Sequence, residues 1–171
     1  LKLKNIKVFG IDNDRKKVNL LKSGSSPINS IKIKYFQNFK DRISENYSLV
    51  ELVDVVIICL PTPLKINKSP DLKYLDLCFK NLDKINLNNK MIILESTVYP
   101  GITRKYANQI TSKISKYKIG KNIFFGYSPE RENPGDKSFS YQKTPKVVSG
   151  YSELCLNMIK KIYSIISKKT F

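Results

Sequence analysis

Stretches with the residue pattern of a β-strand alternate along this chain with stretches typical of an amphipathic helix. The clearest strand is residues 55–60, an apolar run that stops at Pro61. An unbroken apolar strand is typical of a parallel sheet that is covered on both faces. Other short strands are predicted at residues 6–11, 91–94, 123–125 and 146–149. Repeated strand–helix units favour an α/β fold, a Rossmann-like doubly wound parallel sheet.

Helices are expected between these strands. Val18 and Leu21 share a helical face before Gly24, and Ser69 with Pro70 predicts the start of a helix that runs to about residue 83. A third helix begins at residue 102, ends at Gly120 and carries an apolar stripe of Ile102, Tyr106, Ile110, Ile114 and Tyr117. The last predicted helix has on one face Leu154, Met158, Ile162 and Ile165. Residues 31–48 show only weak periodicity, and we assign them no structure.

The charge of the chain is strongly positive: 31 Lys plus Arg stand against 14 Asp plus Glu, a formal charge of +17. Such a balance is typical of nucleic-acid-binding proteins, and a basic nucleic-acid-binding domain is one alternative function. The lysines are spread along the chain, however, and arginine, which makes most bidentate contacts to bases and phosphates, is rare. We therefore interpret the lysines as solvated faces and expect no nucleic-acid partner.

The residue types present narrow the chemistry. The chain has no histidine, which excludes imidazole bases and histidine-bound zinc, and no metal site is expected. Its three cysteines form no CxxC pair and are predicted to be buried, reduced thiols of a cytoplasmic protein, with Cys59 inside a buried strand. No apolar run reaches the ~18 residues of a membrane span. The chain begins with Leu1, which suggests a start inside a longer sequence.

Ligands of parallel α/β sheets bind beyond the carboxyl ends of the strands, so the loops that follow the strands are the candidate site. Asp12 follows the first strand, where dinucleotide-binding folds place an acidic residue for the adenosine ribose; a helix cap is an equally good interpretation. The other loops hold Thr62 between two prolines, the pair Ser96 and Thr97, and the pair Glu130 and Arg131 between two prolines. Turn formation, helix capping and a charged surface loop are their competing interpretations.

A glycine-rich phosphate turn should accompany Asp12. The GxGxxG fingerprint lies ~20 residues before its acidic partner. Counting back from Asp12 runs past the start of the chain, and none of the seven glycines forms a GxG pair. We therefore expect that the first strand and the glycine turn of a dinucleotide fold have been cut away.

Six segments together resemble one family, the NAD-dependent nucleotide-sugar 6-dehydrogenases of the UDP-glucose/GDP-mannose dehydrogenase family. They are VFGIDND at 8–14, DVVIICLPTPL at 54–64, SPDLKYL at 69–75, ILESTVYPG at 93–101, GYSPERENPGD at 126–136 and TPKVVSG at 144–150. Their order and spacing match the family over most of the chain. The SPERENPG loop is more similar to the branch that acts on UDP-N-acetylhexosamines.

The resemblance implies a role for each candidate residue. NAD would be bound by Asp12, Lys17, Leu60, Pro61, Thr62, Pro63, Ser96 and Thr97. Glu130 and Thr97 would be catalytic, with Glu130 positioning or deprotonating a water, and Glu130 and Arg131 would face the UDP-sugar. Family chemistry is a twofold oxidation of the sugar C6 alcohol to a carboxylate, with UDP-N-acetylglucosamine or a related hexosamine as the expected substrate.

The resemblance also implies what the 171 residues lack. The family uses a nucleophilic cysteine, a lysine and an asparagine of a central segment, and a C-terminal domain that binds UDP, and none of these matches the present chain. Residues 1–171 are therefore expected to be a partial NAD-binding domain that is inactive alone, of a parent enzyme that is a cytoplasmic homo-oligomer. A non-catalytic remnant of the fold is the remaining alternative.

Overall fold

A computed structural model describes residues 6–28, 40–130, 145–167 and 169–171. These residues form two compact units, divided between Leu52 and Val53.

The first unit is a small parallel pair of strands with one helix. Strand β1 (Gly10–Ile11) pairs in parallel with β2 (Ile43–Ser44). Helix α1 (Arg15–Lys22) begins after Asp14, whose carboxylate accepts hydrogen bonds from the backbone N–H groups of Lys16 and Lys17. Two 3₁₀ helices, Lys40–Arg42 and Tyr47–Leu52, flank β2. Strand β1 is shorter than the predicted 6–11, and β2 lies in the region that we left unassigned.

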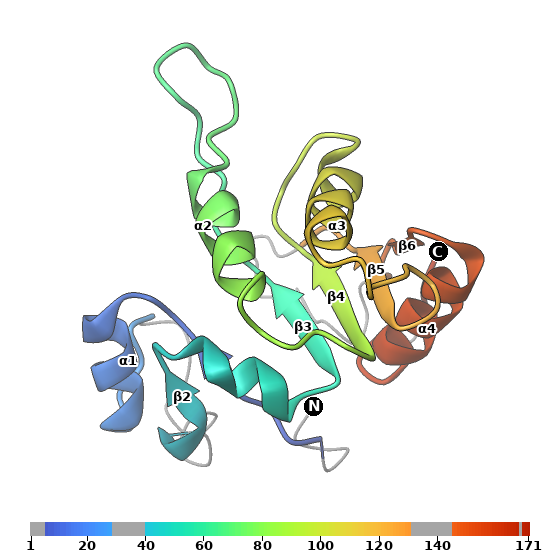
Figure 1. Ribbon diagram of the computed structural model, residues 1–171. Helices are drawn as coiled ribbons and strands as arrows, with labels where there is room; N and C mark the ends of the chain where they lie inside the picture. The colour runs from blue at the N-terminus through green and yellow to red at the C-terminus, as the bar shows by residue number, and fades with distance from the viewer. Residues whose placement is uncertain (1–5, 29–39, 131–144, 168) are drawn as a thin grey trace. The chain divides into compact units, whose positions relative to one another are not determined.

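The second unit holds a four-stranded sheet in the order β3-β4-β5-β6 (Figure 1). Strands β3 (Val55–Ile58), β4 (Lys90–Leu94) and β5 (Ile123–Tyr127) are parallel, as predicted. Strand β6 (Ser149–Gly150) is antiparallel to β5 and replaces the parallel strand predicted at 146–149. The α/β class with a parallel sheet is therefore confirmed, with one antiparallel edge.

Strand β4 is the fully buried strand of this unit: all five of its residues are buried. We predicted that role for residues 55–60, and the prediction was wrong. Strand β3 lies at the edge of the four-stranded sheet, only Ile58 of its residues is fully buried, and Cys59 is exposed just beyond its end. An apolar run does not by itself distinguish a central strand from an edge strand.

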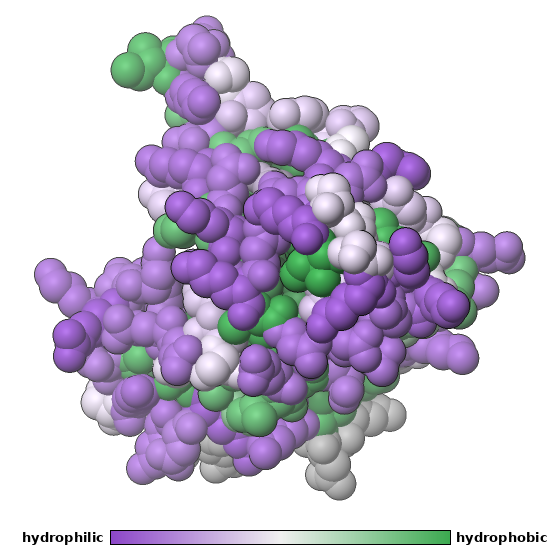
Figure 2. All heavy atoms as spheres, viewed as in Figure 1, coloured by the Kyte–Doolittle hydropathy of each residue, from purple (hydrophilic) through white to green (hydrophobic). Residues whose placement is uncertain are grey.

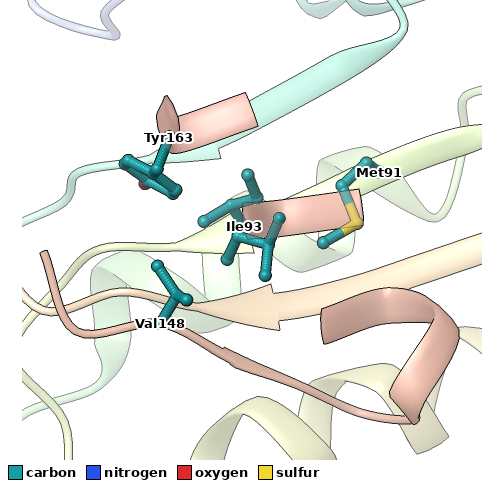
Figure 3. Close-up of a cluster of buried hydrophobic side chains, with 5 residues drawn as sticks. Met91, Ile93, Val148 and Tyr163 are labelled. Atoms are coloured by element: carbon teal, nitrogen blue, oxygen red, sulfur yellow. The ribbon is translucent and has the colours of Figure 1, made fainter. Parts of the chain in front are cut away.

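Helices cover both faces of this sheet (Figure 1). On one face α4 (Glu153–Ser164) packs against Met91, Ile93 and Val148 through Ile159 and Tyr163, as Figure 3 shows for four of the five. Strand residues alternate between faces, so Ile92 and Leu94 point to the other face. There α2 (Lys73–Leu82) and α3 (Ile102–Lys113) are joined by stacking of the Phe79 and Tyr106 rings, whose centroids are 4.1 Å apart.

Three helix predictions need correction. Helix α2 begins at Lys73, because Pro70 forms an antiparallel bridge with Leu64. Helix α3 ends at Lys113, so Ile114 and Tyr117 lie beyond it. Helix α4 buries Cys155, Ile159 and Tyr163, one position away from the predicted face, of which Leu154 and Ile165 are exposed.

Hydrophilic side chains cover most of the face in Figure 2, including the surface over α2 and α3. Exposed apolar residues gather on the loop before α2, where Leu64 and Ile66 are exposed. No helix in the described ranges is long and apolar enough to cross a membrane.

Candidate active site

The loops that follow β3, β4 and β5 are joined by backbone hydrogen bonds at the carboxyl edge of the sheet. The N–H of Glu95 donates to the carbonyl of Ile58 at 2.9 Å, and the N–H of Ser128 donates to the carbonyl of Leu94 at 3.0 Å. The N–H of Glu130 then donates to the carbonyl of Glu95 at 3.3 Å. This ladder carries Glu130 to the same edge as the loops after β3 and β4.

The predicted cofactor residues of two loops contact each other at this edge. The Leu60 N–H donates to Ser96 Oγ at 2.9 Å, and the Thr62 hydroxyl donates to the Thr97 carbonyl at 2.6 Å. Ser96 is buried, whereas Thr97 is exposed. Pro61 and Pro63 are exposed on either side of Thr62. The structure therefore brings Leu60–Pro63 and Ser96–Thr97 together, with the Ser96 side chain used to hold the β3 loop.

Below this edge a cluster of polar side chains surrounds the buried Glu95. The Tyr163 hydroxyl donates to Glu95 Oε1, and Lys146 Nζ lies 3.1 Å from the same oxygen. The Cys59 thiol donates to Glu95 Oε2 at 3.4 Å. Lys146 Nζ also lies 3.7 Å from Glu130 Oε2, so one ammonium links the buried Glu95 to the more exposed Glu130.

The surroundings of this cluster disfavour negative charge on its thiol and phenol. Cys59 is exposed as a residue, but its thiol lies part-buried against Glu95; this partial burial, followed by the Glu95 carboxylate, raises the pKa of the thiol to about 12. Burial and the hydrogen bond to Glu95 likewise raise the pKa of the Tyr163 phenol. Both groups are hydrogen-bond donors to Glu95 and remain protonated near neutral pH.

We expect Cys59 to react slowly with thiol reagents, because only the thiolate is nucleophilic. The pKa rises from 9.0 to about 12, which lowers the thiolate population at pH 8 by about 1,000-fold. The rate of iodoacetamide labelling, followed by mass spectrometry of the Cys59 peptide, should fall accordingly relative to the urea-unfolded chain. Glu95→Gln should raise the rate in the folded chain. Equal rates in folded and unfolded chain would refute this environment.

Sequence reasoning did not identify Glu95, Lys146 and Tyr163 as members of one site. The register of β3 and β4 would have shown part of this cluster. Ile58 pairs with Leu94, so the next residues, Cys59 and Glu95, lie side by side. Strand alternation places both on the face of Met91 and Ile93, which α4 covers. To predict the position of Tyr163 we would have needed the buried face of α4, and our prediction of that face was wrong.

Of the remaining predicted residues, Asp12 and Lys17 belong to the first unit. In the first unit Asp12 directly follows β1; its Oδ1 accepts the Asp14 N–H at 2.8 Å, and Oδ2 lies 3.9 Å from Lys17 Nζ. Asp14, not Asp12, is the cap of α1, so the helix-cap interpretation of Asp12 does not hold. Arg131 lies outside the described residues.

The described residues outside the strand-end loops offer few other places for a ligand. Within the described ranges no cluster of Cys, Asp and Glu could hold a metal ion. A cavity of about 360 Å³ lies between the start of α3 and β6, lined in part by Tyr99, Arg104 and Tyr151. It includes none of the predicted site residues, and the Arg104 guanidinium lies over the Tyr151 ring at 4.6 Å from its centroid.

Comparison with known proteins identifies the family. The model of the NAD binding domain of the UDP-glucose/GDP-mannose dehydrogenase family matches residues 1–167. The chain belongs to the UDP-glucose/GDP-mannose dehydrogenase family. The resemblance inferred from the sequence motifs is thereby confirmed, and NAD is the cofactor of the domain type that the chain matches.

Curated members of this dehydrogenase family are similar along most of the chain. Protein CapL of Staphylococcus aureus is 32% identical over 160 residues, which are 94% of this chain and 38% of that protein. UDP-N-acetyl-D-glucosamine 6-dehydrogenase of Pseudomonas aeruginosa is 34% identical over 123 residues, 71% of this chain and 29% of that protein. The chain thus spans less than half the length of these relatives.

Solved structures show the same fold. The UDP-D-ManNAc dehydrogenase of Pyrococcus horikoshii superposes with a TM-score of 0.86 at 24% identity, covering 99% of this chain and 41% of that chain. The UDP-N-acetyl-mannosamine dehydrogenase Cap5O of Staphylococcus aureus gives 0.85 at 19% identity, covering 98% and 42%. The Rossmann-like arrangement of this dehydrogenase family is therefore confirmed for the chain.

Proposed function

We propose that the chain is the NAD-binding domain of an enzyme that oxidises the C6 hydroxyl of a UDP-N-acetylhexosamine to the uronic acid. The family match and the names of the relatives, a UDP-N-acetyl-D-glucosamine 6-dehydrogenase among them, support this substrate class. The observation that carries the proposal is the carboxyl edge of the sheet. There the loops after β3, β4 and β5 meet, and Glu130 stands beside them.

In this proposal the residues at the strand ends bind NAD. Leu60, Pro61, Thr62, Pro63, Ser96 and Thr97 would line its site. Asp12 fits the adenosine ribose, because its carboxylate has capacity for further hydrogen bonds and Lys17 lies beside it. NAD supplies a hydride acceptor when it is bound. The exposed pair Pro61 and Pro63 makes the β3 loop rigid, which suits a wall of a binding site.

Glu130 and Thr97 would act at the reacting end of the site. Glu130 would position a water or accept its proton, and together with Arg131 would face the UDP-sugar. The exposed position of Thr97 beside the β3 loop supports a direct contact with ligand. Glu95, in contrast, is enclosed by Tyr163, Lys146 and Cys59, so it supports the site from below.

We further propose that the nucleophilic cysteine and the UDP-binding domain are supplied by residues other than these 171, which form a partial NAD-binding domain. Cys59 remains a protonated thiol, and Cys78 and Cys155 are buried. The complete protein would be a homo-oligomer of the cytoplasm. The three free cysteines of residues 1–171 suit a reducing compartment.

The test of this function uses the complete protein encoded by the reading frame in which these residues lie. It should form NADH, followed at 340 nm, with UDP-N-acetylglucosamine or UDP-N-acetylmannosamine. The 171 residues alone should form none, because they offer no activated thiol. UDP-glucose is the matched control substrate and should react more slowly. A complete protein that oxidises no UDP-sugar would refute the proposal, as would turnover by the 171 residues alone.

A further inference from the structure

Lys146 is a deeply enclosed cation at the candidate site. Its side chain is only 4% exposed, and a lysine is rarely buried so deeply unless its charge is paired. Nζ lies 3.1 Å from Glu95 Oε1, 3.7 Å from Glu130 Oε2 and 3.3 Å from the Pro129 carbonyl, to which it donates. The ammonium therefore contacts both the β4 loop and the β5 loop.

The backbone of Lys146 is fixed as firmly as its side chain. Its N–H donates to the Lys169 carbonyl at 2.9 Å, and its carbonyl accepts the Phe171 N–H at 2.9 Å. Its Nζ also lies 5.3 Å from the centre of the Tyr163 ring. With both ends held, the ammonium has little freedom to follow a carboxylate that moves.

The two carboxylates beside Lys146 differ in exposure. Glu95 accepts from Tyr163 and Cys59, and its side chain is 11% exposed. The side chain of Glu130 is 36% exposed. A lysine needed only to neutralise Glu95 would not have to contact the loop of Glu130, yet Lys146 binds the Pro129 carbonyl and faces Glu130.

We propose that Lys146, itself fixed by Glu95 and Tyr163, is a positioning residue that holds the Glu130 carboxylate at the carboxyl edge of the sheet. This role rests on the proposed function of Glu130. The role explains why Lys146, Glu95 and Glu130 lie together under the loops that would bind the ligands. The Coulomb attraction between Lys146 and Glu130 favours side-chain conformations of Glu130 that point back toward the sheet.

The test compares two variants that differ only at Lys146. Lys146→Met alone would leave Glu95 as a buried unpaired charge and could unfold the chain. We therefore compare the single variant Glu95→Gln with the double variant Glu95→Gln plus Lys146→Met. The double variant removes one charge of each sign and leaves no unpaired charge at Glu95. In the chain labelled with [δ-¹³C]glutamate, the Glu130 resonance is assigned by its loss in Glu130→Gln. In the double variant the Glu130 carboxyl resonance should shift toward the chemical shift of the exposed Glu153. In the single variant Glu95→Gln it should not shift in this way.

Kinetics of the complete protein give the second readout. The double variant should lower kcat by about 100-fold relative to Glu95→Gln, with little change of either KM, because a displaced base slows the chemical step more than binding. Lys146→Arg should retain more of kcat than the double variant. Equal Glu130 resonances, or equal kcat values, in the two matched variants overturn the proposal. If the wild-type complete protein is inactive, the proposed function fails, while the resonances still decide whether Lys146 holds Glu130.

Discussion

Glu130→Gln should lower the turnover of the complete protein by about 1,000-fold, the central value for loss of a general base. The amide has the shape of the carboxylate but cannot accept a proton from water. The backbone hydrogen bond from Glu130 to Glu95 does not involve the side chain, so the loop should stay in place. The measurement is kcat for NADH formation at saturating NAD and UDP-N-acetylhexosamine.

Glu153→Gln is the matched control for this substitution. Glu153 is an exposed glutamate in the first turn of α4, and it is not part of the loops that follow β3, β4 and β5. Its replacement makes the same chemical change and should leave kcat unchanged. If Glu130→Gln retains wild-type kcat while its melting temperature is also unchanged, Glu130 has no role in the chemistry.

The architecture and the strand-end loops could be predicted from the sequence because they follow from local patterns. Short apolar runs predicted β3, β4 and β5, and the position of a loop after a parallel strand follows from the fold class. The position of Ser96, Thr62 and Glu130 in loops that follow strands could therefore be predicted without any contact information.

The buried cluster could not be predicted in the same way, because it depends on register and on contacts distant in sequence. Tyr163 and Glu95 are 68 residues apart in the chain. Lys146 precedes a strand of only two residues, which has too short a pattern to show which way a side chain points. The face of α4 was mispredicted because its apolar residues are numerous enough to suggest two overlapping stripes.

The burial of β3 was mispredicted because burial depends on the position of a strand in the sheet. The apolar run of β3 suggested a central strand, but β3 lies at the edge of the four-stranded sheet and has only β4 beside it there, whereas β4 has neighbours on both sides. Strand order is a property of the tertiary structure, and residue type alone does not determine it. Cys59 was placed inside a buried strand for this reason, whereas the structure places it beyond the strand end beside Glu95.

Gly150→Ala should destabilise the chain by at least about 3 kcal/mol, the upper end for overpacked cores. A Cβ at Gly150 would lie 2.1 Å from the backbone nitrogen of Leu156 and 2.7 Å from its Cα. Leu156 is in the first turn of α4, so relief requires the helix to move from β6. That movement would pull Ile159 and Tyr163 out of the core shown in Figure 3. Urea unfolding followed by circular dichroism measures the loss.

Gly126→Ala is the matched comparison, because Gly126 pairs directly with Gly150 across β5 and β6. Its Cβ would meet Ile159 Cδ1 at 2.7 Å and Met91 Cε at 2.8 Å, the ends of side chains that can rotate, and only the Ser149 carbonyl at 3.1 Å belongs to the backbone. The expected cost is about 1–2 kcal/mol. A smaller loss of unfolding free energy for Gly150→Ala than for Gly126→Ala would show that α4 does not pack tightly against β6.

Because Tyr163 is part of α4, Gly150→Ala should also release its hydroxyl from Glu95. The substitution should therefore disturb the contact of Lys146 with Glu95 at the candidate site.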